Sequence, residues 1–304
     1  MPRIVAAIGV LMGAWIGPSL GAQEHGPANG TLVISGGNTM PSSHIIERFI
    51  ELAGGPEAPI VVVPTSGGLD KYDETCPCVA KFREAGARNV KILHTRDRSV
   101  ANSDAFVEPL RKARGVWFEE GNAWRHQDAY LDTKVHRELF ALLDRGGVIG
   151  GGSAGARIQS DYIPVRGVEP AERAIPQSDW RRGFRLVRNV ILDVHVLVRN
   201  RQFDMIGLIN AHPQMLGIAM DENTAIVVRG DKFDVIGTSI VIVYDNQRQV
   251  PPEQAPGEQS LNPATGLFYF LRAGDSYDMK TRKATRPGSP SAFDRVVERS
   301  WKSP

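Results

Sequence analysis

Short apolar runs alternate with amphipathic segments through the first half of the chain. The apolar runs that predict buried strands are 31–35, 60–63, 90–93, 116–118 and 148–149. The segments with helical spacing of apolar positions are 43–53, which Ser42 would cap, 78–85, 105–113 and 133–144. Continuous apolar strands that alternate with helices are typical of a parallel sheet covered on both faces. We therefore predict an α/β fold with a mostly parallel sheet and helices on both faces.

The second half of the chain has a less regular pattern. Residues 162–183 carry three prolines and mixed charge, which indicates an irregular surface segment or flap. The later predicted elements are a strand at 190–192, a helix at 202–209, strands at 216–220, 225–228, 233–236 and 239–244, a loop at 247–264, a strand at 266–271 and a helix at 292–299. Because turns separate the short runs from residue 225 onward, we expect short antiparallel strands toward the C-terminus.

The segment from Val148 to Ala156 has the sequence Val-Ile-Gly-Gly-Gly-Ser-Ala-Gly-Ala. An apolar run that ends in glycines and one serine predicts a sharp turn from a strand into a helix, with Ser153 at its apex. Such a serine projects its hydroxyl above the sheet edge, and the N–H of Ala154 is then placed to bind an oxyanion. The segment predicts a nucleophile. The alternative is a phosphate-binding or purely structural glycine turn.

Glycine and polar residues follow several of the predicted parallel strands. They are Gly36-Gly37, Thr65-Ser66, Gly121-Asn122 and Ser153. The carboxyl ends of parallel strands share one edge of the sheet, and ligands bind at that edge in α/β folds. We therefore expect these residues to converge there, which favours the interpretation of Ser153 as a nucleophile.

His195 is the best candidate for the base that a serine nucleophile needs. It follows the strand at 190–192 and comes after the serine, an order that suits an α/β hydrolase. A histidine in such a place is more often structural. The charged residues around it, Asp193, Arg199 and Arg201, favour a catalytic role instead.

The first 22 residues have the pattern of a secretory signal peptide. Arg3 precedes an apolar run at 4–16, and small residues follow that run. We expect cleavage after Ala22, a spacer at 23–30, a single α/β domain at 31–304, and a secreted or periplasmic location. The alternative is an uncleaved anchor, although the apolar run is short for a membrane span.

The composition of the 304 residues is ordinary for a globular protein, with 42% hydrophobic and 23% charged residues. The formal net charge of +2 gives no reason to expect a nucleic acid or an anionic membrane as a partner. The only two cysteines are Cys76 and Cys78. Their spacing leaves open two free thiols, a surface redox pair or a disulfide in a small ring, and we assign them no function.

Three motifs occur in order along the chain. They are Gly-Gly-Ser-Ala-Gly-Ala at 151–156, Asp-x-His-x-x-x-Arg-x-Arg at 193–201, and Gly-Ile-Ala-Met-Asp-Glu-Asn-Thr-Ala at 217–225. Together they resemble the cyanophycinase family, whose wider membership includes the aspartyl dipeptidase peptidase E. The resemblance, which covers about 31–244, implies a Rossmann-like three-layer sandwich similar to class I glutamine amidotransferases. It also implies a serine exopeptidase that forms an acyl-enzyme.

The resemblance also implies substrates. Cyanophycinases cleave multi-L-arginyl-poly-L-aspartate into β-Asp-Arg dipeptides, and peptidase E removes amino-terminal aspartate from dipeptides. By this likeness the chain would act on Asp-containing or β-Asp-Arg peptides. The family suggests a homodimer, and no step of the reaction requires a metal or an organic cofactor.

Roles for individual residues follow from matching positions. The resemblance implies that Ser153 is the nucleophile and His195 the base. The N–H groups of Ala154 and of Gly121 or Asn122 would bind the oxyanion.

The same motifs imply residues that bind the substrate. Arg199 and Arg201 would bind its carboxylates as bidentate partners. Asp193 would hold a guanidinium group or orient the pocket.

Three glutamates are candidates for the acid of the triad. The family's acid is expected between the serine and the histidine, and Glu169 and Glu172 lie nearest that spacing. Glu222 is the alternative because it follows a strand that ends beside the site and belongs to a matched motif. We rank Glu172 and Glu169 together above Glu222, and each could instead be a solvated surface charge.

The chain departs from the family at the pocket. Glu120-Gly121-Asn122-Ala123 stands where cyanophycinases commonly have Gly-Gly-Asp-Gln, and Val194 stands where they have glutamine. With Glu119 added, these changes would make the pocket more acidic. They leave open a second hypothesis, a non-catalytic binding protein on the same fold. A glutamine-amidotransferase-like or lipase-like hydrolase is weaker, because the turn has no cysteine and no apolar lid segment is present.

Overall fold

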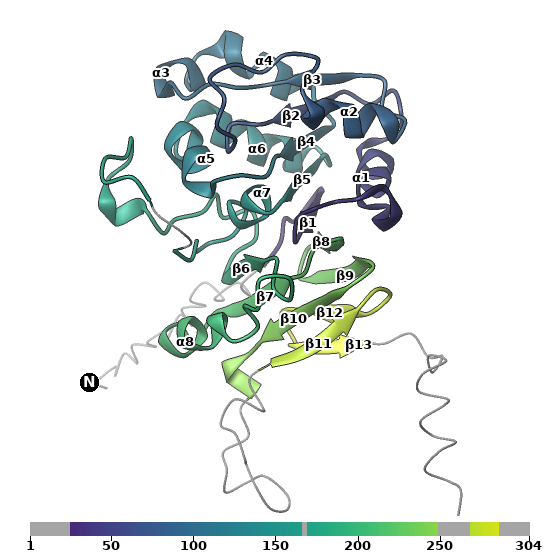
Figure 1. Ribbon diagram of the computed structural model, residues 1–304, viewed down its shortest axis with the longest axis vertical. Coiled ribbons are helices and arrows are strands. Elements are labelled where there is room, and N and C mark those ends of the chain that lie inside the picture. The colour runs from purple at the N-terminus through teal and green to yellow at the C-terminus, as the bar shows by residue number, and fades with distance from the viewer. Residues whose placement is uncertain (1–24, 166–168, 249–267, 286–304) are drawn as a thin grey trace, which may run out of the picture.

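Two β-sheets form the frame of the protein, whose computed structural model describes residues 25–165, 169–248 and 268–285 (Figure 1). From edge to edge, the larger sheet contains β13 (Lys283–Thr285), β12 (Ser276–Asp278), β9 (Lys232–Gly237), β8 (Thr224–Arg229), β1 (Thr31–Ser35), β5 (Val148–Gly152), β4 (Gly115–Phe118), β2 (Ile60–Val63) and β3 (Val90–Ile92). The smaller sheet contains β11 (Phe268–Arg272), β10 (Ile240–Tyr244), β7 (Leu216–Met220) and β6 (Val190–Val194).

The strands β1 to β5 are the parallel half of the larger sheet. Successive strand residues point to opposite faces, so Leu32 and Ile34 enter one core cluster and Val33 enters another. The helices on the Val33 face are α1 (Ile45–Ala53) and α2 (Pro77–Glu84), and those on the Leu32 face are α4 (Asp104–Lys112), α5 (Ala123–Tyr130) and α6 (Lys134–Asp144). The predicted α/β fold with helices on both faces is confirmed.

The antiparallel strands continue the larger sheet beyond β1. β8 pairs antiparallel with β1, and β9, β12 and β13 follow in the same manner. The runs predicted at 225–228 and 233–236 form β8 and β9, so the expectation of short antiparallel strands toward the C-terminus is confirmed. The sequence did not predict β12 and β13, which are three residues long each and alternate too briefly to give a pattern.

The smaller sheet was not expected as a separate unit. Its strands β6 and β7 are parallel, whereas β10 and β11 are antiparallel to their neighbours. The helix α8 (Asp204–Ala211) packs on it through Met205 and Ile209, which lie against Gly217. Each strand was predicted as an apolar run, but such a run does not determine which strand it pairs with.

The helix α5 was missed because two polar residues interrupt the apolar pattern of its buried face. His126 and Gln127 are both buried there, and the Gln127 side-chain amide donates to the carbonyl oxygens of Asp179 and Arg182 at 2.8 and 2.6 Å. The His126 ring packs edge-to-face against Phe118, and its Nε2 lies 3.3 Å from the Glu119 carbonyl oxygen. An analysis that looks for apolar residues at helical spacing does not find such a helix.

The first helix begins later than predicted. Pro41–Ser43 form a short 3-10 turn, and His44, at a φ of 54°, is the residue that precedes α1. Ser42 therefore does not cap the helix, which starts at Ile45 rather than at residue 43. The predicted end is correct, because Gly54 adopts a φ of 110° directly after Ala53.

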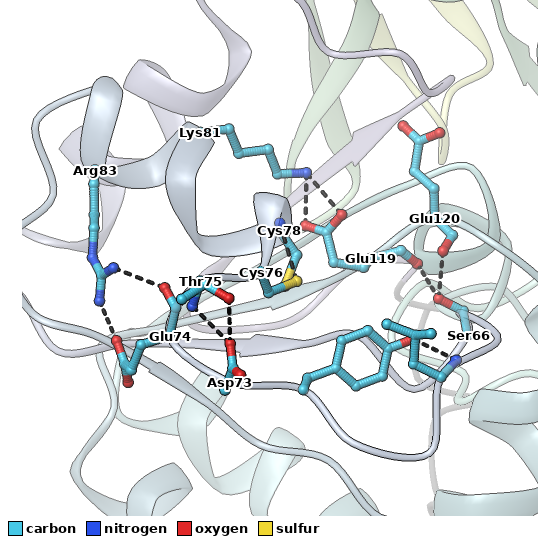
Figure 2. Close-up of a disulfide and its surroundings, with 12 residues drawn as sticks. Ser66, Asp73, Glu74, Thr75, Cys76, Cys78, Lys81, Arg83, Glu119 and Glu120 are labelled. Atoms are coloured by element: carbon cyan, nitrogen blue, oxygen red, sulfur yellow. Dashed lines mark hydrogen bonds and ion pairs between the residues drawn. A yellow bond between two sulfur atoms is a disulfide. The ribbon is translucent and has the colours of Figure 1, made fainter.

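Cys76 and Cys78 form a disulfide at the start of α2 (Figure 2). The Cys78 N–H donates to the Cys76 sulfur at 3.2 Å, so Cys76 caps the helix, and Pro77 occupies its first position. Of the alternatives that the spacing left open, the structure contains the disulfide.

Several predictions concern residues outside the described ranges. They are the signal peptide at 1–22, most of the loop at 247–264 and the helix at 292–299. Among the residues that are described, no helix combines the length and the apolar character needed to cross a bilayer.

The contact between β4 and the helix that follows β5 allows a stability prediction. A Cβ on Gly155 would lie 2.0 Å from the Phe118 carbonyl oxygen, a backbone atom that cannot move away. We expect Gly155→Ala to lower the free energy of unfolding by about 3 kcal/mol, measured by urea denaturation. The control is Gly207→Ala in α8, where no atom lies within 4 Å of the added Cβ. It should be neutral or stabilising by up to about 1 kcal/mol, and equal losses in both variants would contradict this packing.

Candidate active site

Ser153 lies at a sharp turn between β5 and the short helix α7 (Ala154–Arg157). Its backbone has φ 52° and ψ −109°, a conformation that non-glycine residues rarely adopt and that clusters at functional sites. The turn is tight enough that a Cβ on Gly151 would lie 2.4 Å from the Gly155 carbonyl oxygen. The Ser153 N–H donates to the Ser35 carbonyl at 3.1 Å, which ties the turn to the end of β1.

His195 and Glu222 continue from Ser153 in a line of hydrogen bonds. Ser153 Oγ lies 2.8 Å from His195 Nε2, and Glu222 Oε1 lies 2.7 Å from His195 Nδ1. The imidazole is almost fully buried, with 4% of the side chain exposed. In the tautomer with a proton on Nδ1, His195 donates to Glu222 and accepts from the serine hydroxyl. This is the geometry of a serine nucleophile, its base and an orienting acid.

The smaller sheet brings His195 and Glu222 together. β6 and β7 are parallel neighbours with Val194 opposite Met220, so the residues just beyond them share one edge. His195 follows β6 directly, and Glu222 lies in the turn after β7. The feature of the sequence that indicates this contact is therefore that His195 and Glu222 each follow a predicted strand. The number of residues between them does not indicate it.

The two glutamates that we ranked first do not contact His195. Glu169 lines the neighbouring cleft and forms ion pairs with Arg181 at 3.1 Å and Arg173 at 3.4 Å. Glu172 is exposed on the flap. The structure thus places Glu222, the lower-ranked candidate, on His195.

Gly121 and Ser153 line the same cleft, and Ala154 directly follows the serine. Ala154 is the first residue of α7, where the N–H has no acceptor within the helix. The Asn122 N–H donates to the Ser66 carbonyl at 2.9 Å and is therefore engaged. Within the described part of the chain, the Gly121 N–H has no such partner. Of the two alternatives for the second oxyanion donor, the geometry favours Gly121.

Ser66 and Lys81 hold the segment Glu119-Glu120, which directly precedes Gly121 (Figure 2). The Ser66 hydroxyl lies 2.7 Å from the Glu119 carbonyl oxygen and 2.8 Å from that of Glu120. Lys81 on α2 forms an ion pair of 2.6 Å with the Glu119 carboxylate. Burial raises the pKa of Glu119, and the Lys81 ammonium opposes part of that rise. Glu119 thus points to Lys81 and does not add its charge to the pocket.

A cleft of about 210 Å³ adjoins Ser153 and His195. The charged side chains that line it are Arg157, Glu169, Arg199 and Arg201. Three cations against one anion make the cleft favourable to acidic ligands, because guanidinium groups bind carboxylates in a bidentate manner. Asp193, which we expected in the pocket, is fully buried within β6 and is not part of this lining.

Arg173 anchors the flap beside the cleft. Its side chain is fully buried, and it donates to the Asp128 carboxylate at 2.7 Å. The guanidinium lies over the rings of Trp124 and Trp180, 5.6 and 5.3 Å from their centres. This arrangement could not be predicted from the sequence, because Arg173 lies among other charges in an irregular segment.

The described residues contain no group of three or more histidine, cysteine, aspartate or glutamate side chains arranged to hold a metal ion.

A model of the family described as Peptidase family S51 matches residues 31–236, a range that includes Ser153, His195 and Glu222. Cyanophycinase from Geminocystis herdmanii (strain PCC 6308) is 29% identical over 264 residues, which cover 83% of this chain and 94% of that protein. Cyanophycinase from Nostoc sp. (strain PCC 7120) is 30% identical over 225 residues, which cover 70% of this chain and 72% of that protein.

A solved structure has a similar fold. The crystal structure of a peptidase from an acI-B1 Actinobacterium has a TM-score of 0.60 and 20% sequence identity, and the match covers 84% of this chain and 98% of that one. At this identity the likeness concerns the fold alone.

The position of the imidazole generates a prediction about the reactivity of Ser153. Gly37 has a φ of 108°, and a Cβ there would lie 2.5 Å from His195 Cε1. We expect Gly37→Ala to displace the ring and to slow labelling of Ser153 by a fluorophosphonate about a hundredfold. Labelling rates are measured by mass spectrometry of the intact protein.

The control is Gly86→Ala, at a φ of 100° but with no atom within 4 Å of the added Cβ. It carries a similar backbone strain of about 1 kcal/mol and should label at the wild-type rate. A wild-type rate for Gly37→Ala would show that the ring position does not limit the reaction.

Proposed function

The chain belongs to peptidase family S51, and from this premise we propose that it is an exported serine exopeptidase that hydrolyses Asp-containing or β-Asp-Arg peptides through an acyl-enzyme. The observation that carries the proposal is the line of hydrogen bonds from Ser153 Oγ through His195 to Glu222. That the protein is a serine peptidase follows from the family. Its substrate, its export and the role of each residue are the proposal.

The reaction begins when Ser153 Oγ attacks the carbonyl carbon of the scissile amide. His195 Nε2 takes the hydroxyl proton, and Glu222 stabilises the imidazolium that forms. The N–H groups of Gly121 and Ala154 bind the negative oxygen of the tetrahedral intermediate. His195 then gives the proton to the leaving amine, the C–N bond breaks, and an ester on Ser153 remains.

The second half of the reaction uses water as the nucleophile. His195 takes a proton from water, whose oxygen attacks the ester carbon. The same N–H groups bind the second tetrahedral oxygen. When the bond to Ser153 Oγ breaks, the proton returns to that oxygen and a carboxylic acid leaves.

The charge of the cleft supports an acidic substrate. Arg199 and Arg201 line the cleft beside the nucleophile, where they would bind the carboxylates of aspartyl groups. Arg157 adds a third cation at the same lining. The relatives named cyanophycinase support the same substrate class. Ala123 and Val194, both in the lining, are apolar where that family commonly has glutamine, so we expect the preferred peptide to differ in detail.

Export is a further part of the proposal. Its support is the signal-like pattern at 1–22 and the Cys76–Cys78 disulfide, since disulfides persist mainly in oxidising compartments. The expected N-terminus of the exported protein is Gln23, which mass spectrometry of the periplasmic and secreted fractions would test. An intact residue 1 in those fractions would contradict cleavage. The suggested homodimer stays a prediction for sedimentation analysis.

The proposed activity is tested on a panel of peptides. The panel contains cyanophycin, β-Asp-Arg oligomers, α-Asp dipeptides and neutral dipeptides. We expect hydrolysis of at least one acidic member and a fall in kcat of at least about 10⁴-fold in Ser153→Ala, because the nucleophile is lost. The matched control is Ser178→Ala, an exposed serine on the flap, which should hydrolyse the panel at the wild-type rate.

The outcomes separate the catalytic and the substrate parts of the proposal. Equal activity in Ser153→Ala and wild type would contradict the nucleophile. Cleavage of neutral dipeptides alone would contradict the acidic substrate class. Binding of acidic peptides without any hydrolysis would favour the non-catalytic alternative.

A further inference from the structure

Asn38 connects two carboxylates at the edge of the active site. It ends the glycine turn after β1, and its side-chain amide donates to Glu222 Oε2 at 2.9 Å. Its backbone N–H donates to Glu120 Oε1 at 2.7 Å. One residue thus contacts both the acid beside His195 and the residue that precedes the oxyanion glycine, Gly121.

The Glu222 carboxylate is in part accessible to solvent, so hydrogen bonds contribute to its orientation. Its side chain lies in a turn and is 19% exposed, whereas the imidazole that it contacts is 4% exposed. A long side chain at a partly exposed position loses rotamer freedom when it is fixed. The His195 ring contacts Oε1 alone, and the Asn38 amide contacts the other oxygen. Two donors, one on each oxygen, fix the rotation of the carboxylate group, whereas a single donor would leave that rotation free.

The backbone around Asn38 is itself fixed to the turn that carries Glu222. The Asn223 N–H donates to the Gly37 carbonyl at 3.0 Å, and the Met40 N–H donates to the Asn223 side-chain oxygen at 2.8 Å. Asn38 has a φ of 48°, in the left-handed region that asparagine tolerates better than most residues. Both the conformation and the neighbours of Asn38 therefore direct its amide to Glu222.

We propose that Asn38 is a positioning residue for the reaction of Ser153, acting by holding the Glu222 carboxylate in the orientation that accepts the hydrogen bond from His195 Nδ1–H. Glu120 in turn fixes Asn38 by accepting its backbone N–H. This inference rests on the proposed function, because it assigns Glu222 the role of the triad acid. It adds a fourth side chain to the line of Ser153, His195 and Glu222.

The test uses two variants and a readout that does not depend on the substrate. Asn38→Asp keeps the shape but replaces the donor by an acceptor, and Asn38→Gly removes the amide without straining the positive φ. We expect both variants to label at Ser153 with a fluorophosphonate about tenfold more slowly, as for loss of a hydrogen bond to a charged group. With a peptide substrate, kcat should fall and KM should stay unchanged, since Asn38 does not line the cleft.

The control is Asn189→Gly, at a second asparagine with positive φ, 57°. It should label at the wild-type rate, and thermal unfolding of all three variants reports any general loss of stability. If only one Asn38 variant folds, that variant decides the question alone. A wild-type labelling rate in a folded Asn38 variant would overturn the proposal.

A double-mutant cycle separates positioning from a merely structural role. If Asn38 acts through Glu222, Asn38→Gly should cost about tenfold in the wild-type background but less than about twofold in Glu222→Ala, where no carboxylate remains to be held. Equal losses in both backgrounds would overturn the inference. The proposed function fails separately: wild-type protein that does not label at Ser153 would contradict the nucleophile itself.

Discussion

The site depends on the close approach of the turn after β1 to the ends of the smaller sheet. Ser153 follows β5 of the larger sheet, whereas His195 and Glu222 follow β6 and β7 of the smaller one. The His195 N–H donates to the Gly36 carbonyl at 3.2 Å, and a Cβ on Gly36 would lie 2.0 Å from the Asp221 carbonyl oxygen. Only glycine allows the two sheets to meet this closely. The 2.8 Å contact between serine and histidine follows from that meeting.

Two different groups of residues surround Ser153, His195 and Glu222. On one side, Ser66 and the Lys81–Glu119 ion pair hold the turn that presents the Gly121 N–H. On the other side, Arg173 anchors the flap beside a cleft whose lining includes Arg157, Arg199 and Arg201. The first part provides a fixed site for a developing negative charge, as oxyanion stabilisation requires. The second would select acidic groups under the proposed function, so chemistry and specificity would come from different elements.

Much of the fold and part of the site could be predicted from the sequence. The parallel strands were found because each is a continuous apolar run, and Ser153 was found because its turn needs glycines on both sides. The helix α5 was missed because its buried residues include the polar side chains of His126 and Gln127, which interrupt the apolar pattern. Glu222 was ranked too low on spacing, since its contact with His195 arises from the pairing of β6 with β7. Pairing between strands is a tertiary property, which local pattern does not contain.

The most direct test of the account is the rate of Ser153 labelling by a fluorophosphonate in Glu222→Gln, compared with Glu172→Gln. If Glu222 orients His195, the first variant should label roughly 10⁴-fold more slowly than the wild type, as expected when a triad loses its acid and the imidazole its required tautomer. Glu172, exposed on the flap, should be replaceable without effect. A wild-type rate in Glu222→Gln, or a large loss in Glu172→Gln, would contradict the triad of Ser153, His195 and Glu222.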